Sequence, residues 1–354
     1  MSNVQVAVLG ATGMIGQRFI QLLEGHPFFE INGLYASERS DGKRVSQVLK
    51  VKDYEFDQET LNTEIKQIDI KKIAGSCRIA FSGLPAEIAK DIEHDLAEEG
   101  VAVFSNASSH RMRDDVPLLI PEVNPDHLEV VRYQGTYDNG GFIVTNANCS
   151  TTGIALPLKA LHDAFGLRLV CVSTYQALSG AGYPGVPSLD IIGNVLPYIK
   201  SEEEKMEMEI LKMLGTLEDE KVRFAEFDML ANCARVPVID GHLESLTMTF
   251  EKDPEVAEVA SALSEFRAEP QHLELPTAPI DPIIVRDEPD RPQPVLDAFA
   301  GEPKRARGMA VTVGRLRKKD MYFKAFALSH NTLRGGAGGS ILNAELAVEK
   351  GYLR

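Results

Sequence analysis

The chain has 354 residues, which is longer than a domain with a single hydrophobic core usually is, so two domains are expected. Hydrophobic residues make up 44% and charged residues 25%, a composition typical of globular proteins and unlike that of a disordered chain or a fibre. The formal net charge of −15 excludes a broadly basic surface for nucleic acid or anionic membranes, and any anionic substrate must meet local Arg or Lys side chains.

The first part of the chain predicts a parallel sheet wrapped by helices. Residues 4–9 form an apolar run typical of a strand, and apolar residues at helical spacing follow up to position 23. A second strand is expected over residues 31–36. Shorter apolar runs at 79–81, 101–104 and 142–145 are separated by helical or loop stretches. Such alternation of strands and helices is typical of an α/β domain.

The part after residue 167 predicts a second domain of the α+β class. Longer strands at 169–175, 243–250 and 309–314 are separated by a helix-rich insertion and by loops, which favours a mixed sheet. Six prolines between Pro276 and Pro294 predict an extended loop at the surface or at a subunit contact. Residues 340–350 predict a helix that packs back on the first domain.

Targeting signals and cysteine spacing indicate the compartment. The first ten residues lack a basic segment, and no apolar run is long enough to span a bilayer, so a cytoplasmic protein is expected. The four cysteines, at positions 77, 149, 171 and 233, show neither metal-binding nor redox spacing, so no metal site or disulfide scaffold is expected. Most of them are expected to be small buried hydrophobic residues, and only Cys149 has a context that indicates chemistry.

Three glycines predict a dinucleotide-binding turn. Gly10, Gly13 and Gly16 follow the first strand and open the first helix, where backbone N–H groups can approach a pyrophosphate. The spacing is G-x-x-G-x-x-G and not the commonest G-x-G-x-x-G, and a purely structural turn is the alternative. The first domain is therefore expected to be of the Rossmann type.

The end of the second strand indicates which dinucleotide is bound. Ser37, Arg39 and Ser40 surround Glu38, and Lys43 is nearby. An acid at this place usually binds the ribose of NAD, whereas hydroxyl groups and cations suit the 2′-phosphate of NADP. Two hydroxyls and two cations around one acid favour NADP, with a solvated charged loop as the alternative.

Cys149 is the candidate nucleophile. It precedes the apolar-periodic residues 154–165, and at the N-terminus of such a helix the dipole and free N–H groups would lower its thiol pKa and could hold an oxyanion. Among the eight histidines His242 is the candidate proton-transfer partner. Residues 236–239 predict a short strand and residues 240–241 a turn, which would place the His242 ring at a strand edge facing a cleft. A satisfied core or surface histidine is the alternative.

A helix after residue 201 carries two candidate substrate residues. Ser201 and Glu204 predict a capping box that starts it, and Glu209 and Lys212 then share one side, three positions apart. An exposed ion pair is the alternative. Arg235 suits bidentate carboxylate recognition, although a structural ion pair is the commoner fate of a single arginine.

The chain resembles aspartate-semialdehyde dehydrogenase, in its archaeal and fungal branch. The segments that carry the resemblance span nearly the whole chain in order: GATGMIG at 10–16, SSHRMRDDVPLLIPEVN at 108–124, NANCSTTG at 146–153, STYQALSGAG at 173–182, EILKML at 209–214, RVPVIDGH at 235–242 and GGAGGSILNAELAV at 335–348. The resemblance implies an NADP-binding domain of residues 1–149, with residues 335–354 packing back on it, and a catalytic and dimerisation domain of residues 150–334.

The resemblance also implies roles for individual residues. For catalysis it implies Cys149 as the acyl-thioester nucleophile, Gln176 as a residue that places the substrate and His242 as the general acid/base. For the substrate it implies Arg235 at the carboxylate, Glu209 at the amino group, Lys212 with Arg111 at phosphate, and Asn148 in the same pocket. For the cofactor it implies Thr12, Gly13, Met14 and Ile15 at the pyrophosphate, Arg39 and Ser40 near the 2′-phosphate, Ser179 and Gly180 near nicotinamide, and Asn343 at the carboxamide.

The implied reaction is the reversible, NADP-dependent reductive dephosphorylation of L-4-aspartyl phosphate to L-aspartate 4-semialdehyde, in lysine, threonine and methionine biosynthesis. Malonyl-CoA reductase of the same branch would use the same cysteine but leave Glu209 without a purpose. N-acetyl-glutamyl-phosphate reductase is a more distant alternative, with a different sequence around its cysteine. A dinucleotide-sensing protein without catalysis would leave Cys149, Gln176 and His242 unexplained. A homodimer or homotetramer is expected.

Overall fold

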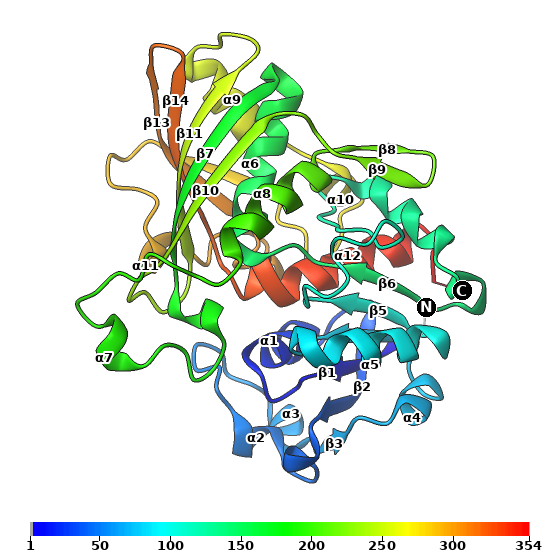
Figure 1. Ribbon diagram of the computed structural model, residues 1–354. Helices are drawn as coiled ribbons and strands as arrows, with labels where there is room; N and C mark the ends of the chain where they lie inside the picture. The colour runs from blue at the N-terminus through cyan, green and yellow to red at the C-terminus, as the bar shows by residue number, and fades with distance from the viewer. Residues whose placement is uncertain (1–2, 354) are drawn as a thin grey trace.

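The computed structural model describes residues 3–353 and contains two six-stranded sheets (Figure 1). The first sheet is parallel throughout, in the order β3-β2-β1-β4-β5-β6. Its strands are β1 (Val4–Leu9), β2 (Phe29–Ala36), β3 (Ile65–Gln67), β4 (Ile79–Ser82), β5 (Ala102–Ser105) and β6 (Phe142–Thr145). The predicted parallel sheet is confirmed, and only the short edge strand β3 was missed.

Helices cover both faces of this sheet, which explains why its strands are continuous apolar runs. One face packs on α1 (Met14–Leu23) and on α12 (Gly338–Glu349), which contacts α1 and β5. The other face packs on α4 (Ile70–Ala74) and α5 (Ala86–Glu98). The C-terminal helix therefore lies against the first sheet, as the sequence predicts.

The second sheet is mixed, in the order β10-β7-β11-β14-β13-β12. Its strands are β7 (Leu167–Gln176), β10 (Asp228–Arg235), β11 (His242–Phe250), β12 (Ile283–Arg286), β13 (Val311–Lys319) and β14 (Tyr322–Ser329). The expected strand over residues 236–239 is wrong, because β10 ends at Arg235 and the next residues leave the sheet. The segment between Pro276 and Pro294 is not all loop, because it contains the edge strand β12, whose four residues include no proline.

One face of the second sheet is covered and the other is largely open. The helices α6 (Cys149–Phe165), α8 (Glu202–Met213) and α9 (Val256–Ser264) pack on the covered face around an apolar core. Side chains of β7 alternate, so that Val170 and Val172 are buried while Tyr175 on the other face is exposed. Figure 1 shows α7 (Ser188–Ile191) standing out from the molecule on its long connection near this sheet.

Short elements complete the chain. They are η1 (Glu38–Ser40), α2 (Val45–Val48), α3 (Gln58–Asn62), η2 (Pro125–Tyr133), η3 (Tyr137–Asn139), η4 (Leu178–Ala181), β8 (Thr216–Glu218), β9 (Lys221–Arg223), α10 (Glu269–His272), α11 (Pro294–Asp297), η5 (Lys304–Ala306) and η6 (Leu333–Ala337). Within residues 3–353, none of the helices has the length and apolar character that crossing a membrane requires.

Candidate active site

Cys149 is the first residue of α6, immediately after the loop that leaves β6. Asn148 is the N-cap: its side-chain oxygen accepts hydrogen bonds from the backbone N–H groups of Ser150 (2.9 Å) and Thr151 (3.2 Å). The cap fixes where the helix begins and so where the sulfur lies. The helix start that the sequence predicts is confirmed.

His242 faces the sulfur from the first position of β11. Its Nε2 lies 3.3 Å from Cys149 Sγ, and its Nδ1 accepts a hydrogen bond from the backbone N–H of Ala177 over 3.0 Å. Residues 93 positions apart are thus brought into contact by the packing of α6 against β11. His242 is the first residue of β11, an inner strand of the second sheet, and does not lie at a sheet edge as expected; the strand predicted before it is absent.

The resting thiol is not activated in the way that the sequence suggested. Burial, together with the charge of Glu202, raises the pKa of the Cys149 thiol to about 12. Arg235 and Arg111 act in the opposite direction but do not compensate. The expected lowering of the thiol pKa at the helix N-terminus is therefore wrong, because desolvation outweighs the positive charges.

Burial also lowers the pKa of His242 well below its usual range, and the charges of Arg235 and His330 add to this effect. The residue is fully buried. His242 is therefore neutral around neutral pH, and Cys149 and His242 form a neutral pair rather than a thiolate and an imidazolium.

Arg235 ends β10 beside Gln176, its partner in the parallel register with β7. Its Nη1 donates to the carbonyl oxygen of Ala177 over 2.7 Å. Gly180 packs tightly on this group, since a Cβ there would stand 2.7 Å from Arg235 Nη1 and 2.9 Å from the His242 ring. The loop that carries Gly180 thus holds the arginine and the histidine at one place.

Glu209 joins three parts of the chain. Its Oε1 pairs with Arg111 Nη1 (2.9 Å), and its Oε2 accepts from the backbone N–H of Asn148 (2.7 Å). Arg111 Nη2 also donates to the carbonyl oxygen of Asn106 (2.8 Å). Glu209 is 2% exposed, so its carboxylate organises Arg111 and the start of α6 from inside the protein.

The side chain of Lys212, which was expected to bind phosphate, points to backbone carbonyl groups and not into a cavity beside Cys149. Its ammonium group donates to the carbonyl oxygens of Arg111 (2.8 Å), Arg113 (2.8 Å) and Val116 (3.2 Å), and burial lowers its pKa to about 8. Lys212 does not line either cavity beside Cys149. A direct phosphate contact is therefore not what this arrangement offers, because three carbonyl groups already occupy the donors.

Two cavities meet at Cys149. The first, of about 420 Å³, is lined by Gly13, Met14 and Ile15 of the glycine turn and by Ser179 and Gly180 of η4. The second, of about 490 Å³, is lined both by residues that the sequence analysis assigned to the functional site and by residues that it did not. The predicted ones are Arg111, Asn148, Gln176 and Arg235; the others include Lys200, Glu202 and Lys205.

The glycine turn is built for close backbone approach. Gly10 has φ +76°, where a side chain would be strained, and a Cβ on Gly16 would stand 2.1 Å from the Gly10 carbonyl oxygen. The carbonyl oxygen of Thr12, in the same turn, accepts from Lys50 Nζ (2.7 Å). The turn opens onto the first cavity through Met14 and Ile15.

The other expected cofactor residues divide into two groups. Ser37, Arg39 and Ser40 lie in and beside η1 at the end of β2, with Ser37 and Arg39 exposed to solvent. Asn343 does not reach the first cavity: it is buried in α12, and its amide nitrogen donates to the Leu119 carbonyl oxygen (3.2 Å). The expected carboxamide contact is therefore not supported.

Asn331 lines the first cavity in the region where Asn343 was expected. Its Nδ2 donates to Ser179 Oγ (2.8 Å), and its Oδ1 accepts from the backbone N–H of Gly241 (2.9 Å). No sequence signal distinguished Asn331. Glu202, in contrast, stands seven positions before Glu209, two helical turns away, so the helical period could have found it.

The predicted capping box at the start of α8 is wrong. Ser201 has φ +54°, and its side chain makes no capping hydrogen bond. The next residue, Glu202, is 6% exposed and lines the second cavity.

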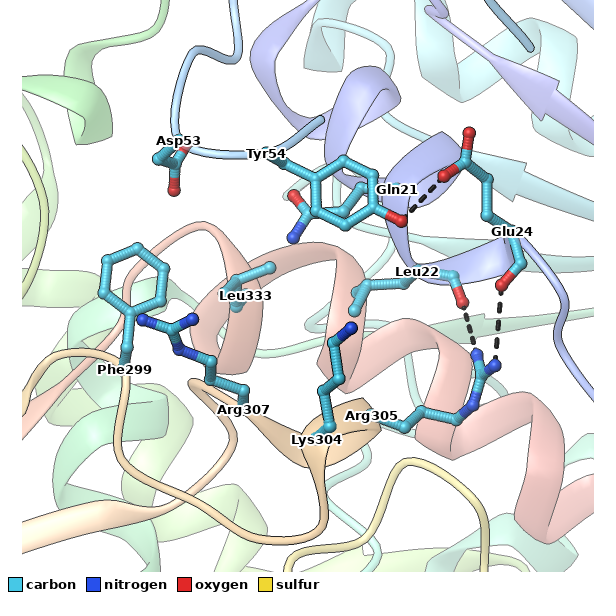
Figure 2. A pocket seen from close by; sticks show the side chains of 10 residues that line it. All are labelled: Gln21, Leu22, Glu24, Asp53, Tyr54, Phe299, Lys304, Arg305, Arg307 and Leu333. Carbon is cyan, nitrogen blue, oxygen red and sulfur yellow. Dashed lines mark hydrogen bonds between the residues drawn. The ribbon is translucent and has the colours of Figure 1, made fainter. Parts of the chain in front are cut away.

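A third cavity, of about 410 Å³, lies at the opposite end of α1 (Figure 2). Figure 2 shows Arg305 of η5 donating to the carbonyl oxygens of Leu22 and Glu24, and the Tyr54 hydroxyl donating to Glu24. These contacts tie η5 to the end of α1. The cavity includes none of the residues around Cys149, so we do not assign the active site to it.

Comparisons with known proteins agree with this geometry. Two family models match the chain: "Semialdehyde dehydrogenase, NAD binding domain" over residues 5–131 and "Semialdehyde dehydrogenase, dimerisation domain" over residues 158–334. Aspartate-semialdehyde dehydrogenase of Archaeoglobus fulgidus is 48% identical, covering 98% of both chains, and that of Schizosaccharomyces pombe is 44% identical over 100% of both.

A solved structure is similar over the same length. The crystal structure of aspartate semialdehyde dehydrogenase with NADP from Candida albicans superposes with a TM-score of 0.88 at 39% identity, covering 98% of this chain and 99% of that one. Together with the full-length relatives, this similarity identifies the chain as a member of the aspartate-semialdehyde dehydrogenase family.

Proposed function

We propose that the chain is an NADP-dependent aspartate-semialdehyde dehydrogenase that reversibly converts L-4-aspartyl phosphate to L-aspartate 4-semialdehyde through a thioester on Cys149. The observation that carries the proposal is the 3.3 Å contact between Cys149 Sγ and His242 Nε2 where two cavities meet. The relatives' names and the NADP of the Candida albicans structure support it, and they do not favour malonyl-CoA reductase or a non-catalytic sensor. The reaction would serve lysine, threonine and methionine biosynthesis.

The residues of the first cavity fit NADP. The backbone of the turn from Gly10 to Ile15 would hold the pyrophosphate at the start of α1, and Arg39 with Ser37 and Ser40 would meet the 2′-phosphate. Ser179 and Gly180 line the part of the cavity next to Cys149, where the nicotinamide belongs. NADPH, when bound, supplies a hydride to the carbonyl carbon of the thioester.

Acylation needs a sulfur nucleophile and a place for its proton. In the reductive direction Cys149 Sγ attacks the acyl carbon, the C–S bond forms and the C–O bond to phosphate breaks. The phosphate oxygens take up the thiol proton, so that the acyl group stays on sulfur and the phosphate of the acyl phosphate dianion leaves as HPO₄²⁻, which balances atoms and charge. This route suits a thiol that is neutral in the resting site.

His242 would act mainly as a hydrogen-bond donor. Because Nδ1 accepts from the Ala177 N–H, the neutral ring carries its proton on Nε2, which faces the sulfur. Nε2–H can therefore stabilise the oxyanion that forms when the thioester is reduced. The C–S bond then breaks, the aldehyde leaves and the thiolate takes a proton from solvent.

The remaining residues would bind and orient the substrate. Arg235 suits the substrate carboxylate and Arg111 the phosphate, since both guanidinium groups line the second cavity. Gln176 and Asn148 border the same space and would position the acyl group. The resemblance assigns the amino group to Glu209 and phosphate also to Lys212, and both side chains also contact protein groups.

The open face of the second sheet and the α7 connection would form a homodimer contact. Large exposed apolar side chains gather in these segments: Tyr175, Tyr183, Leu189, Ile192, Val195, Tyr198 and Leu230. The match to a dimerisation domain supports this assignment. Light scattering on the purified protein would distinguish a dimer from a tetramer. We also propose a cytoplasmic location and the domain division at residues 149/150 and 334/335.

The test of the function is phosphate-dependent reduction of NADP with L-aspartate 4-semialdehyde, beside NADPH oxidation with malonyl-CoA. We expect activity in the first assay alone, and its loss without phosphate and in Cys149→Ser. Activity only with malonyl-CoA would overturn the substrate while keeping the cysteine chemistry. Full turnover by Cys149→Ser would refute the thioester route.

A further inference from the structure

The third cavity, at the end of α1, gathers positive charge in a protein whose net charge is −15. Three of its lining residues are the cations Lys304, Arg305 and Arg307, in and beside η5. The lining also contains two acids, Glu24 and Asp53. The volume of about 410 Å³ is in the range of small-molecule sites. The cavity is therefore large enough for a small anionic molecule.

Two of these cations have no acidic partner. Within residues 3–353, Lys304 forms neither an ion pair nor a hydrogen bond, and Arg307 makes only a cation–π contact, 5.0 Å from the centroid of the Phe299 ring. Arg305, in contrast, donates to carbonyl oxygens at the end of α1. Figure 2 shows Lys304 and Arg307 rising from η5 on one side of the cavity, with Tyr54 on the opposite side. Their donors are therefore available to a ligand.

The two acids of the cavity are already engaged by protein groups. Asp53 Oδ2 forms an ion pair with Nη2 of the buried Arg18 at 3.0 Å. Glu24 Oε2 accepts from the Tyr54 hydroxyl (2.7 Å), and its Oε1 accepts from the backbone N–H of Asp57 (3.2 Å). With Arg18 behind the wall, the cations outnumber the acids by four to two. A bound anion would therefore meet net positive charge.

The rest of the lining includes apolar and aromatic groups. Leu22 and Leu333 are buried, and the rings of Tyr54 and Phe299 border the same space. Such a surface offers little to an inorganic ion, but it can cover the flat or apolar part of an organic molecule. The lining is thus complementary to a small organic dianion, whose charged groups face η5.

A buried arginine joins this cavity to the first one, where NADP fits. Arg18 Nη1 donates to Gln21 Oε1 (2.7 Å) and Nη2 pairs with Asp53, and both partners line the third cavity. Nε of the same guanidinium donates to the hydroxyl of Thr332 (3.2 Å), which lines the first cavity. One guanidinium therefore contacts a wall of each cavity.

The segment after Thr332 gives a second link between the two cavities. Leu333 lines the third cavity, whereas Thr332 and Gly335, on either side of it, line the first. A Cβ on Gly335 would stand 2.8 Å from Cys149 Cα, so the segment packs directly on the nucleophile. Because packed interiors transmit displacements, a ligand that moves Leu333 would change the first cavity.

We propose that the third cavity binds a small organic dianion through Lys304 and Arg307, and that this ligand weakens NADP binding in the first cavity. The anion attracts Arg18 and repels Asp53, which draws the guanidinium away from Thr332. The wall of the first cavity then loses a contact that holds it. Because such coupling is reciprocal, NADP weakens the binding of the dianion by the same factor.

The binding test uses phenyl phosphate and phthalate at pH 8 without NADP, which distinguishes a phosphate from a carboxylate source of the dianion. Calorimetry should show that at least one of them binds, and more tightly than inorganic phosphate. Lys304→Met combined with Arg307→Met should weaken this binding at least about tenfold, because two charge-assisted contacts are lost. Lys71→Met combined with Lys72→Met removes the same charge from exposed positions of α4 and should leave it unchanged.

The coupling test measures the Kd of NADPH from its fluorescence, without substrate or turnover. Saturation with the bound probe should raise this Kd about fivefold, and more probe should have no further effect. The variant with both Lys304→Met and Arg307→Met should bind NADPH as the unaltered protein does and lose the rise. Thr332→Val removes the contact with Arg18, so it should keep probe binding and reduce the rise, whatever its own Kd for NADPH.

Three results would overturn the proposal. They are the absence of binding by either probe, equal losses of binding in the two double variants, and a Kd for NADPH that keeps rising in proportion to the probe. The last would show competition inside the first cavity. The proposal goes beyond the function proposed above, and failure to turn over aspartate semialdehyde would refute that function without affecting these binding measurements.

Discussion

The carboxyl group of Glu244 lies against the backbone of Gly153, so closely that a Cβ on Gly153 would stand 2.5 Å from Glu244 Oε2. Gly153 is one helical turn after Cys149 on α6, so the carboxyl is buried directly behind the nucleophile. Within residues 3–353 neither oxygen of Glu244 has a hydrogen-bond partner. Burial, with the charge of Glu202, raises the pKa of Glu244 well above its usual range, so the fold favours the protonated, neutral form of this carboxyl.

This buried acid predicts a pH-dependent stability. In the unfolded chain Glu244 titrates near pH 4.3, so above that pH the folded protein keeps a proton that the unfolded chain releases. The contribution is fully present below about pH 4.3 and is lost as pH rises toward the folded-state pKa. Glu244→Gln keeps the shape without the titration, so its Tm minus that of the unaltered protein should grow from pH 5 to pH 8. A difference that does not change with pH, as expected for the exposed control Glu204→Gln, would contradict the protonated state.

Lys212 is expected to affect phosphate binding through Arg111. Lys212→Met leaves three carbonyl oxygens of the Arg111 loop without their donor, so it should lower stability by about 1–3 kcal/mol and raise KM for phosphate. Arg111→Met should raise KM for phosphate as well. Steady-state kinetics and thermal unfolding of both single variants would measure these effects.

The double variant decides between an indirect and a direct role. If Lys212 acts by positioning Arg111, Lys212→Met should add little to the phosphate KM of Arg111→Met. Additive increases in KM, together with unchanged Tm in Lys212→Met, would instead support the direct phosphate contact that the family resemblance implies.

The sequence predicted the features that depend on local pattern. Apolar runs located five of the six strands of the first sheet, and the apolar-periodic stretch over residues 154–165 indicated that Cys149 lies at the start of a helix. These features follow from the period of hydrophobic residues, which acts over a few residues. The strand predicted over residues 236–239 was wrong because a short apolar run does not reveal whether a neighbouring strand pairs with it.

The features that depend on long-range contacts were not predictable in this way. Lys212 meets carbonyl oxygens about 100 positions earlier in the chain, and backbone carbonyls have no sequence signature. The thiol pKa of Cys149 depends on burial and on Glu202, 53 positions later, so the helix N-terminus alone gave the wrong direction. Local chemistry identified the nucleophile, whereas its electrostatic environment required the packed structure.

The Ala177–His242 hydrogen bond predicts that two substitutions of His242 will differ. Gln can present an amide N–H near the position of Nε2–H, whereas Asn is one methylene shorter and cannot reach it. His242→Asn should lower kcat about 10²- to 10⁴-fold, and His242→Gln should retain roughly tenfold more activity than His242→Asn. Equal losses would indicate that His242 acts as a base, a role that neither amide can replace.

The alkylation of Cys149 tests the neutral thiol of the empty site. A free cysteine has a pKa of about 8.5, whereas that of Cys149 is raised to about 12. Iodoacetamide reacts with the thiolate, so Cys149 should react more slowly than a free thiol, and its rate should rise about tenfold per pH unit from pH 7 to 9. Peptide mass spectrometry would separate Cys149 from the half-buried Cys171.

Variants that remove a charge near Cys149 should change its alkylation rate in opposite directions. Glu202→Gln removes a negative charge that raises the thiol pKa and should speed alkylation at fixed pH, whereas Arg235→Gln removes a positive charge and should slow it. Glu204→Gln, on the exposed side of α8, should leave the rate unchanged. A rate that is already constant between pH 7 and 9 would mean that the thiolate is formed in the empty enzyme. In that case the helix N-terminus and the two arginines outweigh burial, and the thiol proton would leave before the acyl phosphate binds.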